Sequence, residues 1–200
     1  LEPFARRSRL ARGGDRCEIC GGALDARHRH VVDRTDRRLL CACAACALSF
    51  GASRGRFRTV PEGARPAPAE VTGEALRAAG VPVGLAFFFR TSNPARWTAV
   101  FPSPAGPTEA ELSEGALQAF PELARDVEED VEALLVHARR DGSSTCLVAP
   151  IDACYGLVAV LRRTWRGIDG GDEAREAIES FVAGLVERCG AVRARGEVES

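Results

Sequence analysis

Apolar residues follow different patterns in the first third of the chain and in the remainder. Between residues 15 and 60 the apolar runs are short. They predict a strand over 28–33, a polar turn over 34–37, a strand over 38–41 and a last strand that begins at Leu48 or Arg56 and ends at Val60. A module of this size is too small to bury an adequate core. We therefore expect it to need another source of stability.

Longer apolar segments follow a stretch rich in proline and glycine over 61–69. The pattern predicts a helix from Thr72 to Ala79 ended by Gly80, a buried strand over 81–90 and its hairpin partner over 97–101. A loop over 102–107 and a helix over 109–120 are expected next. The run over 131–137 fits a strand or a helix, and 144–149 predicts a strand.

Two helices are expected at the end of the chain. Asp152 is the predicted cap of a helix that reaches about Trp165, and Asp172 begins a helix that ends before Gly190. One face of the last helix is apolar, with Ala174, Ile178, Phe181, Leu185 and Cys189 at spacings of three or four. Strands and helices mix without a β-α-β rhythm, which indicates the α+β class with a central antiparallel hairpin and packed helices.

The organisation predicted from these patterns has five parts. A loose basic arm over 1–14 precedes a small N-terminal module over 15–60. The linker over 61–69 leads to the α+β domain over 70–192, and a tail over 193–200 closes the chain.

Two C-x-x-C pairs predict that the small N-terminal module is a zinc ribbon, held by a metal ion. The predicted ligands are Cys17, Cys20, Cys43 and Cys46, because their spacing brings two turns of thiolates to one tetrahedral ion. Zinc is the expected ion, and rubredoxin-like iron is the alternative, since tetrahedral sulfur suits both. Ala47 follows the second pair, where rubredoxins have glycine, which favours zinc.

Three further residues of the module are candidate substitute ligands. Cys41 lies two residues before Cys43, so the second pair has the alternative form Cys41 with Cys46. His28 and His30 are two apart on a predicted strand and so share one face, where an imidazole can replace a sulfur. Solvated polar side chains are the other reading of these histidines.

Composition excludes several classes of function. All 27 basic residues are arginine, and without lysine the chain cannot form a Schiff base, anchor pyridoxal phosphate or use a P-loop lysine. No apolar run approaches the roughly 18 residues that span a bilayer, and no secretory signal is recognised, so we expect a cytoplasmic protein. Eight cysteines there indicate metal ligands and core thiols rather than disulfides.

Charge is divided unevenly along the chain. Residues 1–66 carry 14 arginines against 7 acidic residues, whereas the rest carries 13 against 21. The basic hairpin, with Arg29, Arg34 and Arg38, fits a protein partner, nucleic acid or the acidic second part of the same chain, and the last needs no partner. Phe50 and Phe57 are the only candidates of the module for base stacking, and the acidic second part would repel a polyanion, so a protein partner is preferred to nucleic acid.

Residues with catalytic potential are few. Cys154, with His137 as its base, is a candidate nucleophile near a helix start. Cys154 also belongs to the apolar stripe of its helix, which predicts a core residue, and Cys146 and Cys189 are interpreted in the same way. The glycine turn over 167–172 carries two aspartates that would repel phosphate, so we interpret it as a helix cap. No enzyme activity is predicted.

Several segments resemble a known bacterial family of unknown function. They are Cys17-Glu18-Ile19-Cys20-Gly21, residues 28–33, 39–46, 83–89, 101–106, 150–155 and 165–167, which together span nearly the whole chain. Members of that family are encoded beside nickel-iron hydrogenase structural and maturation genes. The resemblance implies a metal-binding accessory or assembly role with a protein partner, such as a hydrogenase subunit or maturation factor. A nucleic-acid-binding regulator and an iron electron-transfer protein are the alternatives.

Overall fold

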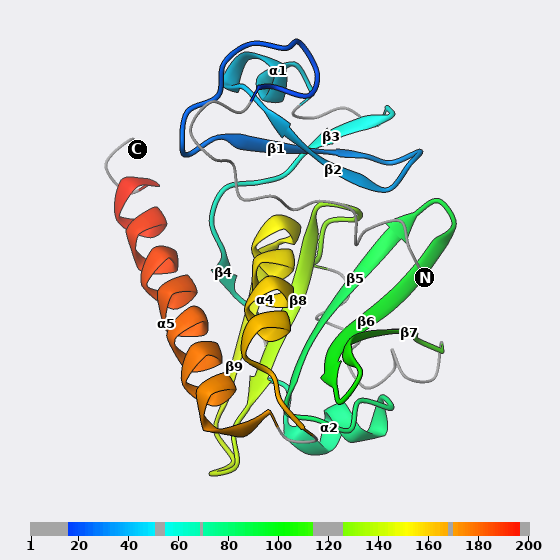
Figure 1. Cartoon of the computed structure of the whole chain (residues 1–200), viewed down its shortest axis with the longest axis vertical. Coiled ribbons are helices and arrows are strands. Elements are labelled where there is room, and N and C mark those ends of the chain that lie inside the picture. The colour runs from blue at the N-terminus through cyan, green and yellow to red at the C-terminus, as the bar shows by residue number, and fades with distance from the viewer. Residues whose placement is uncertain (1–15, 51–54, 69, 114–125, 168–169, 197–200) are drawn as a thin grey trace. The chain divides into compact units, whose positions relative to one another are not determined.

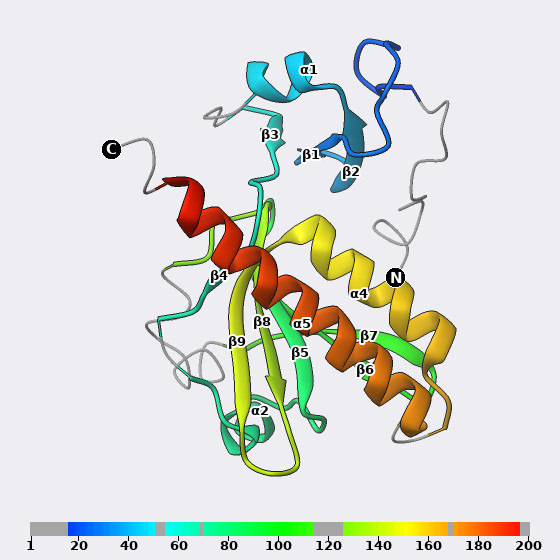
Figure 2. The same ribbon diagram turned by 90° about the vertical axis from the view of Figure 1, so that its left-hand side faces the viewer.

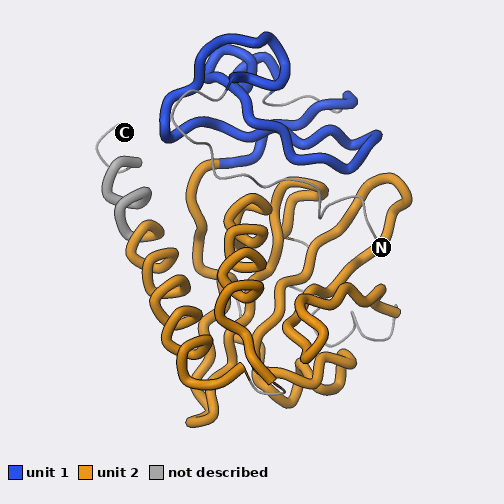
Figure 3. Tube along the Cα trace, viewed as in Figure 1, with its two compact units in different colours: residues 1–61 blue, residues 62–200 orange. Residues whose placement is uncertain are grey.

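The structure is a computed structural model that describes residues 16–50, 55–68, 70–113, 126–167 and 170–196. It divides into two compact units, residues 1–61 and residues 62–200 (Figure 3). The arm predicted over 1–14 lies outside the described residues. Mixed helices and antiparallel sheets confirm the α+β class.

The first unit is built on a three-stranded antiparallel sheet in the order β2-β1-β3. Its elements are β1 (Arg29–Asp33), β2 (Arg38–Ala42), α1 (Ala44–Ser49) and β3 (Phe57–Thr59). Asp33 closes the β1–β2 turn, because its carboxylate accepts hydrogen bonds from the backbone N–H groups of Thr35 and Asp36. Of the two predicted starts for the last strand, the later one is correct, since Leu48 lies in α1 and is 78% exposed.

Few residues are buried at the centre of this unit. Cys17, Val31, Ala42 and Ala47 form its hydrophobic cluster, and Cys43 and Cys46 pack against it half-buried. Three of its four central residues are small, so the apolar area that they remove from water is modest. The cysteines therefore occupy the place that a larger domain fills with aliphatic side chains.

The second unit contains a six-stranded antiparallel sheet in the order β4-β9-β8-β5-β6-β7. The strands are β4 (Arg65–Pro66), β5 (Leu85–Ser92), β6 (Ala95–Ser103), β7 (Gly106–Glu111), β8 (Glu132–Ala138) and β9 (Ser144–Pro150). The predicted hairpin is confirmed as β5 and β6, and the ambiguous run over 131–137 is strand β8. Helices α4 (Ile151–Thr164) and α5 (Gly171–Gly196) lie along one face of the sheet (Figure 1, Figure 2).

Strand β5 is buried on both faces, which explains its unbroken apolar sequence. Phe87 packs edge-on against Tyr155 of α4, on the face that the helices cover. Phe88 points the other way and joins a cluster with Leu76 of α2 (Gly73–Ala78). Thr72 caps α2 by accepting a hydrogen bond from the Ala75 N–H, and Gly80, with φ +81°, follows the helix end as predicted.

The expected helix over 109–120 is wrong where the structure describes it. Residues 106–111 form β7, and Pro102 lies opposite Pro107 in the β6–β7 pairing. The prolines favour a loop in the sequence, but Pro107 lies in β7, which is at the edge of the sheet and tolerates a residue that lacks an N–H. Residues 114–120 lie outside the described part of the chain.

Smaller differences concern the linker and the two long helices. Arg65 and Pro66, within the predicted linker, pair with β9 as an edge strand, and Arg65 forms an ion pair with the buried Glu132. Asp152 lies in the first turn of α4, whose N-cap is Pro150.

Helix α5 continues to Gly196 instead of ending before Gly190, because one glycine costs a helix only about 1 kcal/mol. Val182 is buried on its stripe in place of Phe181. No helix within the described ranges is long and apolar enough to cross a membrane.

Candidate metal centre

The first cysteine pair lies in a turn that reverses the chain. The Cys17 N–H donates to the Gly22 carbonyl and the Gly21 N–H donates to the Cys17 carbonyl, both at 2.8 Å. Gly21 has φ +75°, a conformation that a residue with a side chain rarely adopts. The turn buries Cys17 and leaves Cys20 exposed at its tip.

The second pair is positioned by the start of helix α1. Cys43 is the N-cap residue, and its carbonyl accepts the Ala47 N–H at 3.0 Å. Cys46 follows three residues later within the helix. Because residues three apart on a helix lie on the same side, the two sulfurs of this pair face one point.

These four residues bring their sulfurs together as the spacing predicts. The Sγ atoms of Cys17, Cys20, Cys43 and Cys46 all lie within 4.8 Å of one another, and the Cys20 and Cys43 sulfurs are 3.8 Å apart. Sulfurs bound to one tetrahedral ion at about 2.3 Å are separated by about 3.8 Å. All eight cysteines of the chain are described and are free thiols. The cluster therefore has the ligand number and the approximate spacing that a zinc or iron ion requires.

Electrostatics at the cluster favour a bound cation. Burial by itself raises the pKa of the Cys17 thiol, but backbone N–H groups of Cys20, Cys43 and Ile19 stabilise its thiolate and bring the pKa to about 6. The sulfurs of Cys20 and Cys43, followed by burial, raise the pKa of Cys46 to about 12. One thiolate forms readily, and its negative charge opposes the formation of further thiolates beside it. A divalent cation removes that repulsion.

The other three candidate ligands form a group of their own. A ring nitrogen of His28, a ring nitrogen of His30 and the Cys41 sulfur lie within 4.8 Å of one another. The structure thus gathers Cys41 with the two histidines and not with Cys46.

The candidate nucleophile is a core residue, as its position on the apolar stripe of α4 indicates. Cys154 is 1% exposed, and burial raises the pKa of its thiol far above the usual value. Cys189 is buried too and donates its S–H to the Leu185 carbonyl, whereas Cys146 is half-buried and accepts the Val71 N–H. His137 faces Glu179, with its Nε2 atom 3.8 Å from the carboxylate.

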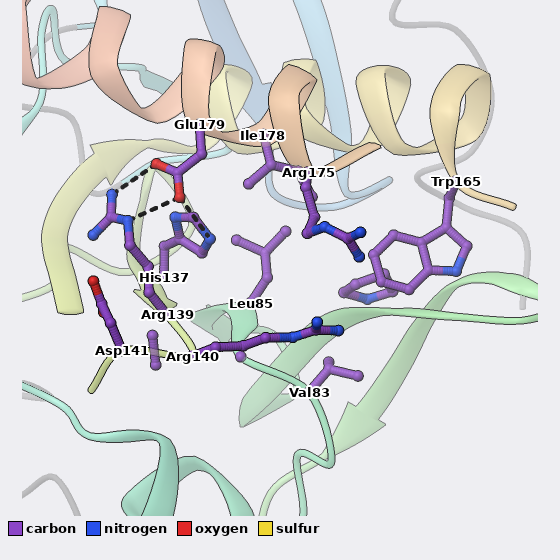
Figure 4. A pocket seen from close by; sticks show the side chains of 13 residues that line it. Val83, Leu85, His137, Arg139, Arg140, Asp141, Trp165, Arg175, Ile178 and Glu179 are labelled. Carbon is purple, nitrogen blue, oxygen red and sulfur yellow. Dashed lines mark hydrogen bonds and ion pairs between the residues drawn. The ribbon is translucent and has the colours of Figure 1, made fainter. Parts of the chain in front are cut away.

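A pocket in the second unit was not predicted from the sequence. Its volume is about 480 Å³, and it is lined by parts of β5, β6, the β8–β9 turn and α5, with Trp165 at one side (Figure 4). Arg139 donates two hydrogen bonds to Glu179, at 2.8 and 2.9 Å. The pocket is lined by apolar side chains together with arginines and the carboxylates of Asp141 and Glu179. No local motif marks it, because its walls come from segments far apart in the sequence.

Comparison with known proteins identifies the family alone. The model of a family described as a family of unknown function (DUF5947) matches residues 16–189, so the chain belongs to that family. No curated protein and no solved structure matches.

Proposed function

We propose that this member of the DUF5947 family is a metal-binding accessory protein whose first unit is a zinc-held docking module. The observation that carries the proposal is the convergence of the Cys17, Cys20, Cys43 and Cys46 sulfurs in a unit with a minimal apolar core. Four thiolates form a closed coordination shell, which is the arrangement of structural zinc sites. In this proposal the ion stabilises the fold and takes no part in a reaction.

Docking to a protein agrees with the surface of the first unit. Leu48 is 78% exposed on α1, two residues after Cys46, and Arg27 is exposed before β1. Arginine is enriched at protein interfaces, where apolar side chains form the buried centre. The partner that we propose is a subunit or maturation factor of a nickel-iron hydrogenase, and this choice rests on the family resemblance.

Metal analysis of the purified full-length protein tests the first part of the proposal. We expect zinc bound to the four cysteines and its loss in Cys20→Ser, whose exposed side chain contributes little to packing. Cys154→Ser is the matched control, since that thiol lies in the second unit. A folded protein that binds no metal at the four cysteines would contradict the proposal. A red protein containing iron would instead support the electron-transfer alternative.

Capture from the native host tests the partner. Arg27→Glu with Arg29→Glu reverses charge at the start of β1, and Leu48→Glu removes the exposed apolar side chain. Arg38 is left unchanged because it lies 3.5 Å from Glu18, beside the metal site. Recovery of hydrogenase subunits or maturation factors by the wild type, and not by these variants, is the expected result. Arg162→Glu with Arg163→Glu, exposed on α4, is the control that should retain the partner.

The positions of the two candidate stacking residues argue against the nucleic-acid alternative. The rings of Phe50 and Phe57 pack against each other with centroids 5.2 Å apart and border the buried cluster of the first unit. They are therefore poorly placed to stack on bases. Binding to single-stranded DNA or RNA that weakens steeply with salt would revive this alternative.

A further inference from the structure

Strand pairing places two imidazoles and one thiol on a single face of the first unit. His30 on β1 lies directly opposite Cys41 on β2. Directly opposite residues have Cβ atoms about 5 Å apart. His28 precedes His30 by two residues, and the centroids of the two rings are 4.9 Å apart. All three donor groups have atoms within 4.8 Å of one another.

This face is separate from the four-cysteine cluster. Side chains alternate between the two faces of a strand, so His30 and Cys41 point away from their neighbours Val31 and Ala42. Val31 and Ala42 pack with Cys17 in the hydrophobic cluster that Cys43 and Cys46 border. The β1–β2 ladder therefore separates the two groups of ligands.

The hydrogen bond that His28 makes leaves one of its ring nitrogens able to bind an ion. Its Nδ1 atom lies 3.2 Å from the Asp25 carbonyl, and a carbonyl can only accept, so Nδ1 carries the proton in this hydrogen bond. The lone pair then resides on Nε2. That atom is buried and has no hydrogen-bond partner among the described residues. A carbonyl that orients one ring nitrogen while the other binds an ion is the usual arrangement of metal-bound histidines.

Glu18 holds the backbone of Cys41, the third candidate ligand, by two hydrogen bonds. Its carboxylate accepts the Cys41 N–H at 2.8 Å, and its own N–H donates to the Cys41 carbonyl at 2.9 Å. Glu18 lies between Cys17 and Cys20, so the first cysteine turn holds the backbone of Cys41 in place. The position of the thiol is thus set by more than the strand pairing.

We infer that His28, His30 and Cys41 bind a second divalent transition-metal ion, distinct from the ion of the four cysteines. Two imidazoles and a thiolate select ions such as zinc, cobalt or nickel and disfavour magnesium and calcium, which prefer oxygen. Three protein ligands leave one position for water or for a ligand from outside the chain, unlike a closed structural site. The second ion is therefore the exchangeable one. This inference goes beyond the proposed function, because a docking module needs a structural ion only.

Cobalt titration of the full-length, metal-free and reduced protein tests the inference. Cobalt(II) is the probe because its absorption reports the number of thiolates on each ion. We expect two ions per wild-type chain, of which a mild chelator removes one first. His30→Ala and His28→Gln should each bind one ion, with the spectrum of the four-thiolate site retained. The third histidine of the chain supplies the control, since His137→Ala should still bind two.

Other outcomes separate this inference from the proposed function. One ion in the wild type that is kept in His30→Ala and lost in Cys20→Ser would overturn the second site and leave the proposed function intact. One ion in the wild type that is lost in His30→Ala and kept in Cys20→Ser would support the histidine site and contradict the four-cysteine site. Two ions in both histidine variants would also overturn the inference.

Discussion

The two units of this chain keep their folds by different means. At the centre of the first unit, Cys17 and three small aliphatic residues are buried, and two of the remaining proposed ligands border them. The second unit buries Phe87, Phe89, Leu135 and Leu157 between a six-stranded sheet and two helices. In the first unit the proposed ligand Cys17 is itself part of the core, whereas the core of the second unit contains no proposed ligand. Metal should therefore decide the fold of one unit and leave the other unaffected.

The largest expected effect comes from removing a ligand of the first unit. Cys43→Ser deletes one of four thiolates from the proposed zinc site, and structural zinc sites have binding energies on the order of 10 kcal/mol that are largely folding energy. We expect loss of the ion and unfolding of residues 16–60, measured by metal content and by the amide NMR signals of β1 and β2. Cys189→Ser, buried in α5, is the control and should keep the ion. Loss of the ion without unfolding would break the comparison.

A cavity in the second unit should produce the opposite result. Phe87 is 2% exposed and contacts Phe89 and Tyr155, so Phe87→Ala should destabilise the second unit by about 4 kcal/mol. Both tryptophans of the chain, Trp97 and Trp165, belong to the second unit. Their fluorescence during urea denaturation therefore reports the unfolding of this unit and not of the first. The ion content should not change. A loss of metal in this variant would show that the units are not independent.

An ion pair gives the first unit stability that does not depend on the metal. Asp33 is 4% exposed and accepts from the Arg56 guanidinium at 2.6, 3.0 and 3.1 Å. Asp33→Ala leaves the hydrogen-bond donors of Asp33 unsatisfied and should lower the stability of the first unit by about 2 kcal/mol. The change is measured as an increase in the zinc concentration needed to fold the unit. Asp36→Ala is the control, because that carboxylate is exposed and 3.4 Å from Arg56.

The pH dependence of this contribution has a definite sign. Arg56 holds the pKa of Asp33 below its usual value. The stabilisation is therefore complete above the unfolded pKa of about 3.9 and is lost as the pH falls through the lower folded pKa. Near neutral pH the difference in stability between Asp33→Ala and the wild type should not change with pH.

The smallest expected effect is a pH dependence confined to the second unit. Burial lowers the pKa of His137, and the charge of Glu179 offsets this only in part. The unfolded state then binds more protons, so the stability that neutral His137 contributes is present above about pH 6.5 and declines at lower pH. Between pH 5 and 7, His137→Gln should reduce the pH dependence of the second unit's free energy of unfolding, measured by tryptophan fluorescence. An unchanged slope would contradict this assignment.

Local chemistry accounts for what the sequence predicted well. Thr72 and Gly80 bound a short helix, and the apolar run of β5 with its turn at Ser92 specifies a hairpin. The spacing of the two C-x-x-C pairs was sufficient to group Cys17, Cys20, Cys43 and Cys46. In each case the residues that carry the signal are close in sequence or have a fixed interval.

The features that could not be predicted depend on register and on distant segments. Grouping Cys41 with His30 requires knowing that these residues are opposite in the β1–β2 ladder. The pocket combines the β8–β9 turn with α5, and Glu179 meets Arg139 only after both have packed on the sheet. Strand β7 could not be recognised because an edge strand tolerates Pro107, and a sequence does not reveal which strand is at an edge.

Hydrogen exchange of the full-length protein, with zinc bound and after its removal by a chelator, tests the central claim most directly. Removal should abolish the protection of the amides of Val31, Val32 and Leu40 in the first unit. The amides of Phe88, Leu134 and Leu135 in the second unit should keep theirs, because that core contains no ligand. Persistent protection of β1 and β2 in the metal-free protein would contradict the account, since the first unit would then fold without an ion.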